Sequence, residues 1–264
     1  MNILIISLCW NEEDILPFVL QYWCDMRSKL KGNLKAIVYD NGSTDSSVEI
    51  LSKYDWIEIK PFDTGNKKDN DAHKDLKNKC WKEYKNYYDL IIVCDIDEIL
   101  YLSNPEATIS KMKDGGYNIL ATPWYALCED SKPQYEEGKL LHTLCTKFYK
   151  QKSNHMKGYE TVCKFNIFDP KLVNDMGWSV GNHIAHITPN KKILTINKEE
   201  GFCLHICAGF GYEYKYNRNQ LQQNRLSDKN KQKGYSRQYN YDLEKVKMNY
   251  KEHQRESFNI NEKG

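Results

Sequence analysis

The sequence predicts an α/β fold, in which a mostly parallel central sheet is flanked by helices and followed by a helical C-terminal extension. Strand-sized apolar runs alternate with segments of helical spacing over the first hundred residues. The run at residues 90–94 is apolar throughout, as in a strand that is buried on both faces. Such alternation favours a parallel sheet covered by helices, and 264 residues suffice for one sizeable core.

The first hundred residues contain four predicted strands separated by three predicted helices. Asn41-Gly42 is a typical turn pair, and residues 43–45 are residue types that often cap a helix. Residues 71–88 place apolar side chains on one side of a lysine-rich helix. The predicted strands are residues 2–8, 34–39, 56–60 and 89–94, and the predicted helices are residues 12–27, 48–51 and 71–88.

The remaining chain has a looser pattern. Shorter strands are predicted at residues 118–125, 144–149, 162–168 and 192–196, and helices at 217–226 and 241–255, with a loop at 227–236. Residues 213–264 contain 12 Lys and Arg against 7 Asp and Glu. We expect this polar, basic extension to present a solvated helical face. A contact with a membrane surface or an anionic glycan is the alternative.

Composition excludes several classes of protein. Lys and Arg number 38 against 36 Asp and Glu, and the chain has no nucleic-acid fold signature, so we expect no nucleic-acid partner. No run approaches the roughly 18 apolar residues of a membrane span, and the first residues lack the basic region of a signal peptide. The nine cysteines include no C-x-x-C pair, which favours a reducing compartment. We therefore expect a cytoplasmic protein.

Acidic and amide side chains follow three of the predicted strands. Asn11 and Glu12 follow the first strand, Asp40 ends the second, and Asp95 and Asp97 follow the fourth. The carboxyl ends of parallel strands share one edge of a sheet, where ligands bind. Clustered carboxylates repel one another unless a cation or hydrogen-bond donors intervene. The D-x-D spacing therefore predicts a site for Mg²⁺ or Mn²⁺, with helix capping as the alternative.

Three motifs resemble a known family. WNEEDILPF (residues 10–18), YDNGSTD (39–45) and CDIDEIL (94–100) are similar to the N-terminal signature of family 2-like glycosyltransferases. The resemblance covers residues 2–102. It implies a Rossmann-like GT-A fold, a sugar-nucleotide donor, a divalent cation and inversion at the anomeric carbon. It also implies a catalytic domain over residues 1–212, with a nucleotide-binding half (1–102) and an acceptor half (103–212), followed by the extension (213–264).

The resemblance implies roles for individual residues. Asn11 and Glu12 are expected beside the nucleoside, and Asp40 at the base or ribose. Asp95 is expected at the ribose and the metal, and Asp97 at the metal.

Two further residues are candidates for the donor site. Lys74 is a candidate phosphate contact, although a surface lysine is the simpler interpretation. His205 is a candidate second metal ligand, because family members often present a histidine from this region. The alternatives for His205 are a histidine packed on a strand and a zinc site with Cys203 and Cys207, which would need a fourth ligand.

The catalytic base of the family typically follows the D-x-D motif by somewhat under a hundred residues. His183 falls in that window, and an imidazole near its reference pKa suits proton transfer from a hydroxyl. Asp175, Glu160 and Asp130 are the alternatives, and a purely structural role for His183 stays open.

The predicted function is transfer of a sugar from a nucleoside diphosphate, with a UDP-sugar favoured, to an acceptor hydroxyl. The expected cofactor is Mn²⁺ or Mg²⁺, and the acceptor is a glycan, a lipid-linked molecule or a protein. One alternative is a phosphotransferase of the haloacid dehalogenase type, although that class carries its D-x-D on the first strand. The other is a degenerate sugar-nucleotide-binding protein without catalysis.

Overall fold

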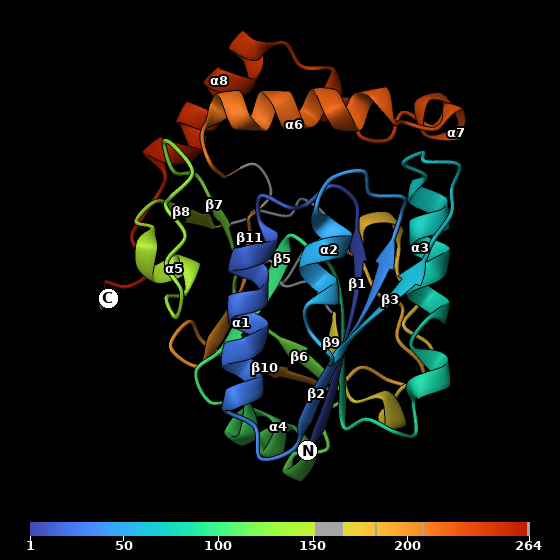
Figure 1. Ribbon diagram of the computed structural model, residues 1–264. Helices are drawn as coiled ribbons and strands as arrows, with labels where there is room; N and C mark the ends of the chain where they lie inside the picture. Colours follow the sequence, from blue (N-terminus) through green and yellow to red (C-terminus); the bar gives the residue numbers. More distant parts are fainter. Residues whose placement is uncertain (151–165, 183, 207–208, 263–264) are drawn as a thin grey trace.

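A seven-stranded sheet forms the centre of the molecule in the computed structural model (Figure 1), which describes residues 1–150, 166–182, 184–206 and 209–262. Within these residues the strand order is β10-β6-β9-β4-β1-β2-β3. The strands β3, β2, β1 and β4 run parallel, whereas β9 runs antiparallel to β4 and β6. The strands are β1 (Asn2–Cys9), β2 (Asn33–Asp40), β3 (Ile57–Pro61), β4 (Leu90–Asp95), β6 (Ile119–Ala121), β9 (Ile167–Phe168) and β10 (Ile193–Thr195).

A second sheet with the order β5-β11-β7-β8 lies beside the first in the described part of the chain. Its strand β11 pairs antiparallel with β5, so that His205 lies opposite Glu98. Because β5 begins directly after the D-x-D motif, this pairing brings His205 to the carboxyl end of β4. The strands are β5 (Glu98–Leu102), β7 (Trp124–Leu127), β8 (Phe148–Lys150) and β11 (Gly201–His205).

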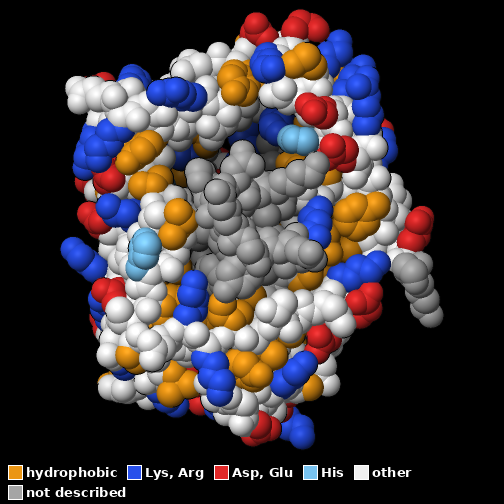
Figure 2. All heavy atoms as spheres, turned by 180° about the vertical axis from the view of Figure 1, so that it is seen from behind, with side chains coloured by type: hydrophobic (Ala, Val, Ile, Leu, Met, Phe, Trp, Pro, Cys, Tyr) orange, Lys and Arg blue, Asp and Glu red, His pale blue; other side chains and the backbone are white. Residues whose placement is uncertain are grey.

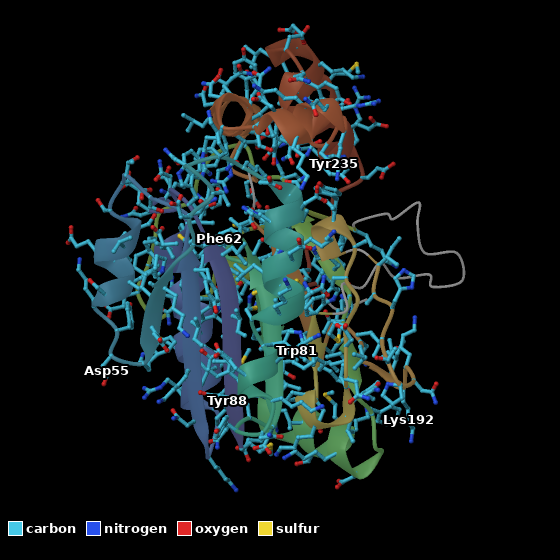
Figure 3. All side chains as sticks on the ribbon, turned by 90° about the vertical axis from the view of Figure 1, so that its right-hand side faces the viewer. Asp55, Phe62, Trp81, Tyr88, Lys192 and Tyr235 are labelled. Carbon is cyan, nitrogen blue, oxygen red and sulfur yellow. The ribbon has the colours of Figure 1, made fainter. Side chains whose placement is uncertain are left out.

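Helices cover both faces of the large sheet. Ile3 and Ile5 of β1 pack in one core with α1, while Leu4 and Ile6 pack in a second core around Trp81. Trp81, which follows α3 (Figure 3), is fully buried. The two sets of side chains alternate because successive residues of a strand point to opposite faces. The helices are α1 (Leu16–Ser28), α2 (Ser47–Ser52), α3 (Asn70–Lys79), α4 (Pro105–Asp114), α5 (Leu141–Leu144), α6 (Tyr212–Asn224), α7 (Asp228–Gln232) and α8 (Leu243–Arg255).

The predicted fold class is confirmed, including the four parallel strands of the first half. The first helix begins at Leu16 rather than at residue 12, because Pro17 is tolerated in the first turn of a helix but not in its interior. The helix predicted over 71–88 ends at Lys79, and Lys82–Tyr84 form a 3₁₀ helix after the buried Trp81.

The second half differs more from the sequence prediction. The strand predicted over 118–125 is two strands, β6 and β7, which belong to different sheets and meet at Pro123. Proline removes a ladder hydrogen bond and interrupts a strand. The predicted loop at 227–236 contains α7, and β5 and α4 were missed. The strand predicted over 144–149 is β8, which begins at Phe148. Only Ile167–Phe168 of the strand predicted over 162–168 is a described strand.

The C-terminal extension lies across the end of the large sheet where β1 and β4 terminate (Figure 1). Figure 3 shows this helical layer, with Tyr235 labelled, above the sheet and α3. Tyr250 of α8 is buried, and its hydroxyl donates to the carbonyl of Glu129 at 2.6 Å and accepts from Gly211 N at 2.9 Å. One side of the extension therefore packs on the rest of the chain, while many of its polar side chains are exposed, as a solvated helical face requires. In the described residues, no helix combines the length and apolar character that a membrane crossing requires.

His142 is a buried histidine beside α1. The Tyr22 hydroxyl lies 2.8 Å from Nδ1 and also accepts a hydrogen bond from the backbone N–H of His142 at 2.9 Å. Burial lowers the pKa of His142 from 6.5 to about 4. The folded protein therefore holds this imidazole in its neutral form.

We expect the free energy of unfolding to fall as the pH decreases from 6.5 towards 4. In this window the unfolded chain binds more protons than the folded chain, so His142 lowers stability by at most about 1.4 kcal/mol per pH unit. Urea denaturation of the wild type and of His142→Gln at pH 7 and pH 5 measures the effect. The variant should show a smaller loss on acidification. His186→Gln changes an exposed histidine and is the control; identical losses in all three proteins would contradict the assignment.

Candidate active site

A cavity of about 380 Å³ lies at the carboxyl ends of β1 and β4, and residues of α6 line one side of it. The view from behind shows Lys and Arg side chains around a hollow in the upper half of that face (Figure 2). The first and fourth strand ends meet here, together with β11 and the extension. The charged and histidine side chains that line it are Glu12, Lys68, His73, Lys74, Lys77, Asp95, Asp97, Glu98, His205, Lys215, Arg218 and Arg225.

The two carboxylates of the D-x-D motif face this cavity from the end of β4. Asp95 Oδ1 lies 2.8 Å from Nζ of Lys77, whose side chain on α3 is only 4% exposed. Asp97 is buried, and its Oδ2 lies 3.6 Å from Nε2 of His205. The three residues that the sequence assigned to the metal region thus line one cavity, and Asp97 and His205 lie next to each other in it. Lys77 was missed, because one lysine among several on a predicted helix gives no signal of its own.

Asp97 and His205 are placed so that they could supply two ligands to one cation. Their separation of 3.6 Å is too long for a normal hydrogen bond. It is compatible with two ligands that each lie about 2.1 Å from one ion. No group of three or more His, Cys, Asp or Glu side chains that could hold a metal ion occurs in the described residues. Such an ion would therefore need further ligands from water and substrate oxygens, which is usual for Mg²⁺.

Glu12 and Arg218 form an ion pair inside the cavity. Glu12 follows β1, Arg218 projects from α6, and Oε1 and Nη2 are 2.5 Å apart. Their side chains are only 6% and 12% exposed. Burial raises the pKa of Glu12 to about 7, although Arg218 opposes the shift. Arg218 was missed, because the extension contains many similar basic residues.

Asn11 and Asp40 do not line the cavity; they shape the loops beside it. The amide of Asn11 accepts from Thr44 N at 2.7 Å and donates to Thr44 Oγ1 at 3.1 Å. Asp40 accepts from the backbone N–H groups of Gly42 and Ser43, each at 3.1 Å. Asn11 has a φ of 50°, which asparagine tolerates better than most residues. Their contact with a nucleoside stays a prediction.

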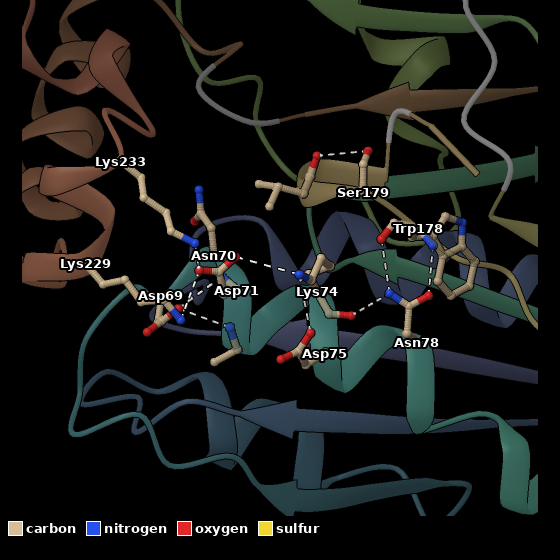
Figure 4. Close-up of polar contacts among 12 residues, drawn as sticks. Asp69, Asn70, Asp71, Lys74, Asp75, Asn78, Trp178, Ser179, Lys229 and Lys233 are labelled. Atoms are coloured by element: carbon tan, nitrogen blue, oxygen red, sulfur yellow. Dashed lines mark hydrogen bonds and ion pairs between the residues drawn. The ribbon is translucent and has the colours of Figure 1, made fainter. Parts of the chain in front are cut away.

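Lys74 lines the cavity at the start of α3. Its Nζ lies 3.7 Å from Asp71 Oδ1 and 3.5 Å from Asp75 Oδ1 (Figure 4). These carboxylates position the ammonium at the cavity rim. The phosphate contact expected of Lys74 is compatible with this place and stays a prediction.

Two of the four candidate bases lie in the described residues, and neither of them lines the cavity. Asp175 and Asp130 do not line it, and each forms an ion pair with a lysine elsewhere. His183 and Glu160 lie outside the described residues, as does Cys207 of the alternative zinc site.

The extension reaches into the site through Arg225 and Tyr239. The guanidinium carbon of Arg225 lies 3.5 Å from the centroid of the Trp10 ring, and Nη2 donates to the carbonyl of Asn41 at 3.3 Å. Lys68 Nζ donates to the hydroxyl of Tyr239 at 2.6 Å. Sequence patterns gave no signal for these contacts, because they join residues far apart in the chain.

Asp71 joins the start of α3 to α7. Its Oδ2 lies 3.0 Å from Nζ of Lys229 and 2.6 Å from Nζ of Lys233 (Figure 4). Hydrogen bonds from these lysines lower the pKa of Asp71 to about 2. Beside this pair, Asn70 N donates to Oδ1 of Asn230 at 3.1 Å. Polar contacts therefore hold this end of the extension over the cavity.

Comparisons with known proteins identify a family. The family model described as Glycosyl transferase family 2 matches residues 4–173. Two structures of S. aureus TarS, each 12% identical, align over 84% of this chain with TM-scores of 0.49 and 0.48. A structure of S. aureus TarS in complex with UDP-GlcNAc aligns over 96% of this chain and 72% of that chain, with 12% identity and a TM-score of 0.42. The chain spans 39% and 64% of the first two TarS chains. No curated protein matches the sequence.

We expect Asp71→Asn to loosen the end of the extension without unfolding the sheet. The variant loses the negative charge that binds two lysines of the α7 region, so both ion pairs are removed together. Hydrogen exchange of residues 227–240 should accelerate by about tenfold or more. Asp75→Asn removes a neighbouring carboxylate that contacts Lys74 instead and should leave this segment protected. Equal protection in both variants would show that Asp71 does not hold the extension.

Proposed function

The chain belongs to glycosyl transferase family 2, and from that membership we propose that it moves a sugar from a nucleoside diphosphate to an acceptor hydroxyl. One observation carries the proposal: the matched segment contains the D-x-D carboxylates, and these face the cavity at the end of the parallel strands. This is the edge at which open α/β sheets bind ligands. The favoured donor is a UDP-sugar, and the acceptor is a glycan, a lipid-linked molecule or a protein.

The charge of the cavity suits a diphosphate. Among the described residues, six Lys and Arg side chains line it, against four carboxylates, so this part of the wall offers a net positive charge to an anionic donor. Asp95, held by Lys77, can accept a hydrogen bond from a ribose hydroxyl. The basic side chains are Lys68, Lys74, Lys77, Lys215, Arg218 and Arg225.

The reaction is a displacement at the anomeric carbon. The acceptor oxygen forms the new bond while the bond to the diphosphate oxygen breaks, and the departing oxygen takes the electron pair. A base removes the proton of the acceptor hydroxyl. Asp175 and Asp130 do not line the cavity and already pair with lysines, which leaves His183 and Glu160 as candidates. We keep His183 as the candidate base, because an imidazole near its reference pKa suits proton transfer from a hydroxyl. Attack opposite to the leaving group inverts the anomeric configuration.

Enzymes of this family typically use a divalent cation. Asp97 and His205 are the residues that would hold it, and the pairing of imidazole with carboxylate favours Mn²⁺ over Mg²⁺. When bound, the ion offsets the negative charge of the departing diphosphate. His205 must present an unprotonated nitrogen to bind it, so acid weakens the affinity. A site at the end of β4 also argues against the phosphotransferase alternative, which carries its motif on the first strand.

Asp97→Asn tests the metal assignment. We expect the variant to fold, because Asp97 lies in a turn after β4, and to lose at least about a hundredfold in turnover. Its affinity for UDP should no longer depend on Mn²⁺. Release of nucleoside diphosphate from a panel of sugar nucleotides measures turnover, and calorimetry measures binding. Asp114→Asn, an exposed change on α4, is the control. Near-normal turnover of Asp97→Asn would overturn the assignment.

His205→Ala and His183→Ala should respond differently to added metal. A ligand affects occupancy of the ion, whereas a base acts in the transition state. We expect His205→Ala to need more Mn²⁺ and to recover part of its turnover at high Mn²⁺. His183→Ala should lose about a hundredfold in turnover, with no recovery. Activity measured across a Mn²⁺ titration distinguishes a metal ligand from a base. Recovery of His183→Ala instead would exchange the two roles, and unchanged activity in both would reject them.

A further inference from the structure

Arg218 lies between two acidic side chains of the cavity. Its Nη2 is 2.5 Å from Oε1 of Glu12 and 3.7 Å from Oδ2 of Asp97. The same Oδ2 is 3.6 Å from Nε2 of His205. Glu12 and Asp97 belong to the segment that matches the family, whereas Arg218 lies in the extension, outside that match. A guanidinium from the extension thus reaches the place where the D-x-D motif ends.

Glu12 faces Arg218 and is buried with it. Its Oε2 is also buried and has no hydrogen-bond partner within the described residues, so the main polar contact shown for this carboxylate is the guanidinium. Burying an acidic group is costly unless a cation compensates. The backbone of α6 is fixed nearby, because Gly211 at its start bonds to Tyr250 and Arg225 at its end stacks on Trp10. The pair therefore fixes where the guanidinium points.

We infer that Arg218 binds the diphosphate of the donor and that Glu12 is the positioning residue that orients its guanidinium. The inference rests on the proposed function. A diphosphate that binds an ion held by Asp97 also comes close to Arg218. The reason is that the ion site and the guanidinium both lie beside Oδ2 of Asp97. The planar N–H groups of a guanidinium match phosphate oxygens in shape and charge. In this arrangement Glu12 acts through Arg218, a role that differs from the contact with the nucleoside that the sequence predicted for it.

This arrangement assigns a catalytic contribution to the extension. As the bond between the anomeric carbon and the diphosphate oxygen breaks, that oxygen keeps the electron pair and gains negative charge. A fixed guanidinium beside it stabilises this charge without reorganisation. Arg218 gives up no proton, because arginine stays charged in proteins.

The experiment compares UDP with uridine, each in the presence of Mn²⁺, on the full chain. Arg218→Gln removes the charge but leaves Glu12 buried alone, so the double variant Glu12→Gln/Arg218→Gln is the main test. We expect the double variant to keep a melting temperature close to that of the wild type. Its affinity for UDP should fall about tenfold or more, while its affinity for uridine changes less than about twofold. Glu12→Gln alone should weaken UDP binding by a smaller factor.

Two further variants keep the result decisive. Arg218→Lys keeps the charge but loses the planar N–H groups of the guanidinium, so it should bind UDP several-fold more weakly. This variant gives a result even if the double variant fails to fold. Arg237→Gln removes an exposed arginine from the same extension and should bind UDP as the wild type does. Unchanged UDP affinity in the double variant or in Arg218→Lys overturns the role of Arg218 but not the proposed function. A wild-type protein that binds no nucleoside diphosphate from a panel overturns the proposed function as well.

Discussion

The repulsion between acidic side chains at the carboxyl ends of the parallel strands is the constraint on which the rest of the structure depends. Glu12, Asp95, Asp97 and Glu98 all line one cavity, and carboxylates in such a place repel one another unless cations intervene. Each cation comes from a different part of the chain. Lys77 on α3 pairs with Asp95, and Arg218 on α6 pairs with Glu12. The site is therefore complete only when α3 and the extension are both in place.

This constraint explains why a polar C-terminal segment packs over the sheet. Its contacts with the α3 side are largely ion pairs and hydrogen bonds, such as those of Asp71 with Lys229 and Lys233. Arg225 covers Trp10 and bonds to the carbonyl of Asn41, so the extension also fixes the loops that follow β1 and β2. Asn11 and Asp40 shape those loops from within. Arg225, Trp10 and Asn41 also form part of the wall of the cavity, whereas Asn11 and Asp40 support the loops from outside it.

Much of the fold could be predicted from the sequence, because the four parallel strands are apolar runs whose signal is local. The placement of Asp95, Asp97 and His205 at one edge of the sheet was also predicted, on the D-x-D spacing and the family resemblance. Arg218 and Lys77 were missed, since their partners lie 206 and 18 positions away and only the tertiary structure selects them from many similar residues. The division of 118–125 into β6 and β7 was missed, although Pro123 between the two strands is a local signal that interrupts a strand.

The central claim is that the cavity binds a nucleoside diphosphate with the help of the D-x-D region. A thermal-shift titration of the wild-type protein with UDP and Mn²⁺, beside uridine and Mn²⁺, tests it most directly. A ligand at about a hundred times its dissociation constant stabilises the folded protein by about 2.7 kcal/mol. We expect a clear rise in melting temperature with UDP that is larger in the presence of Mn²⁺ and is smaller with uridine. No stabilisation by UDP or by any other nucleoside diphosphate would contradict it.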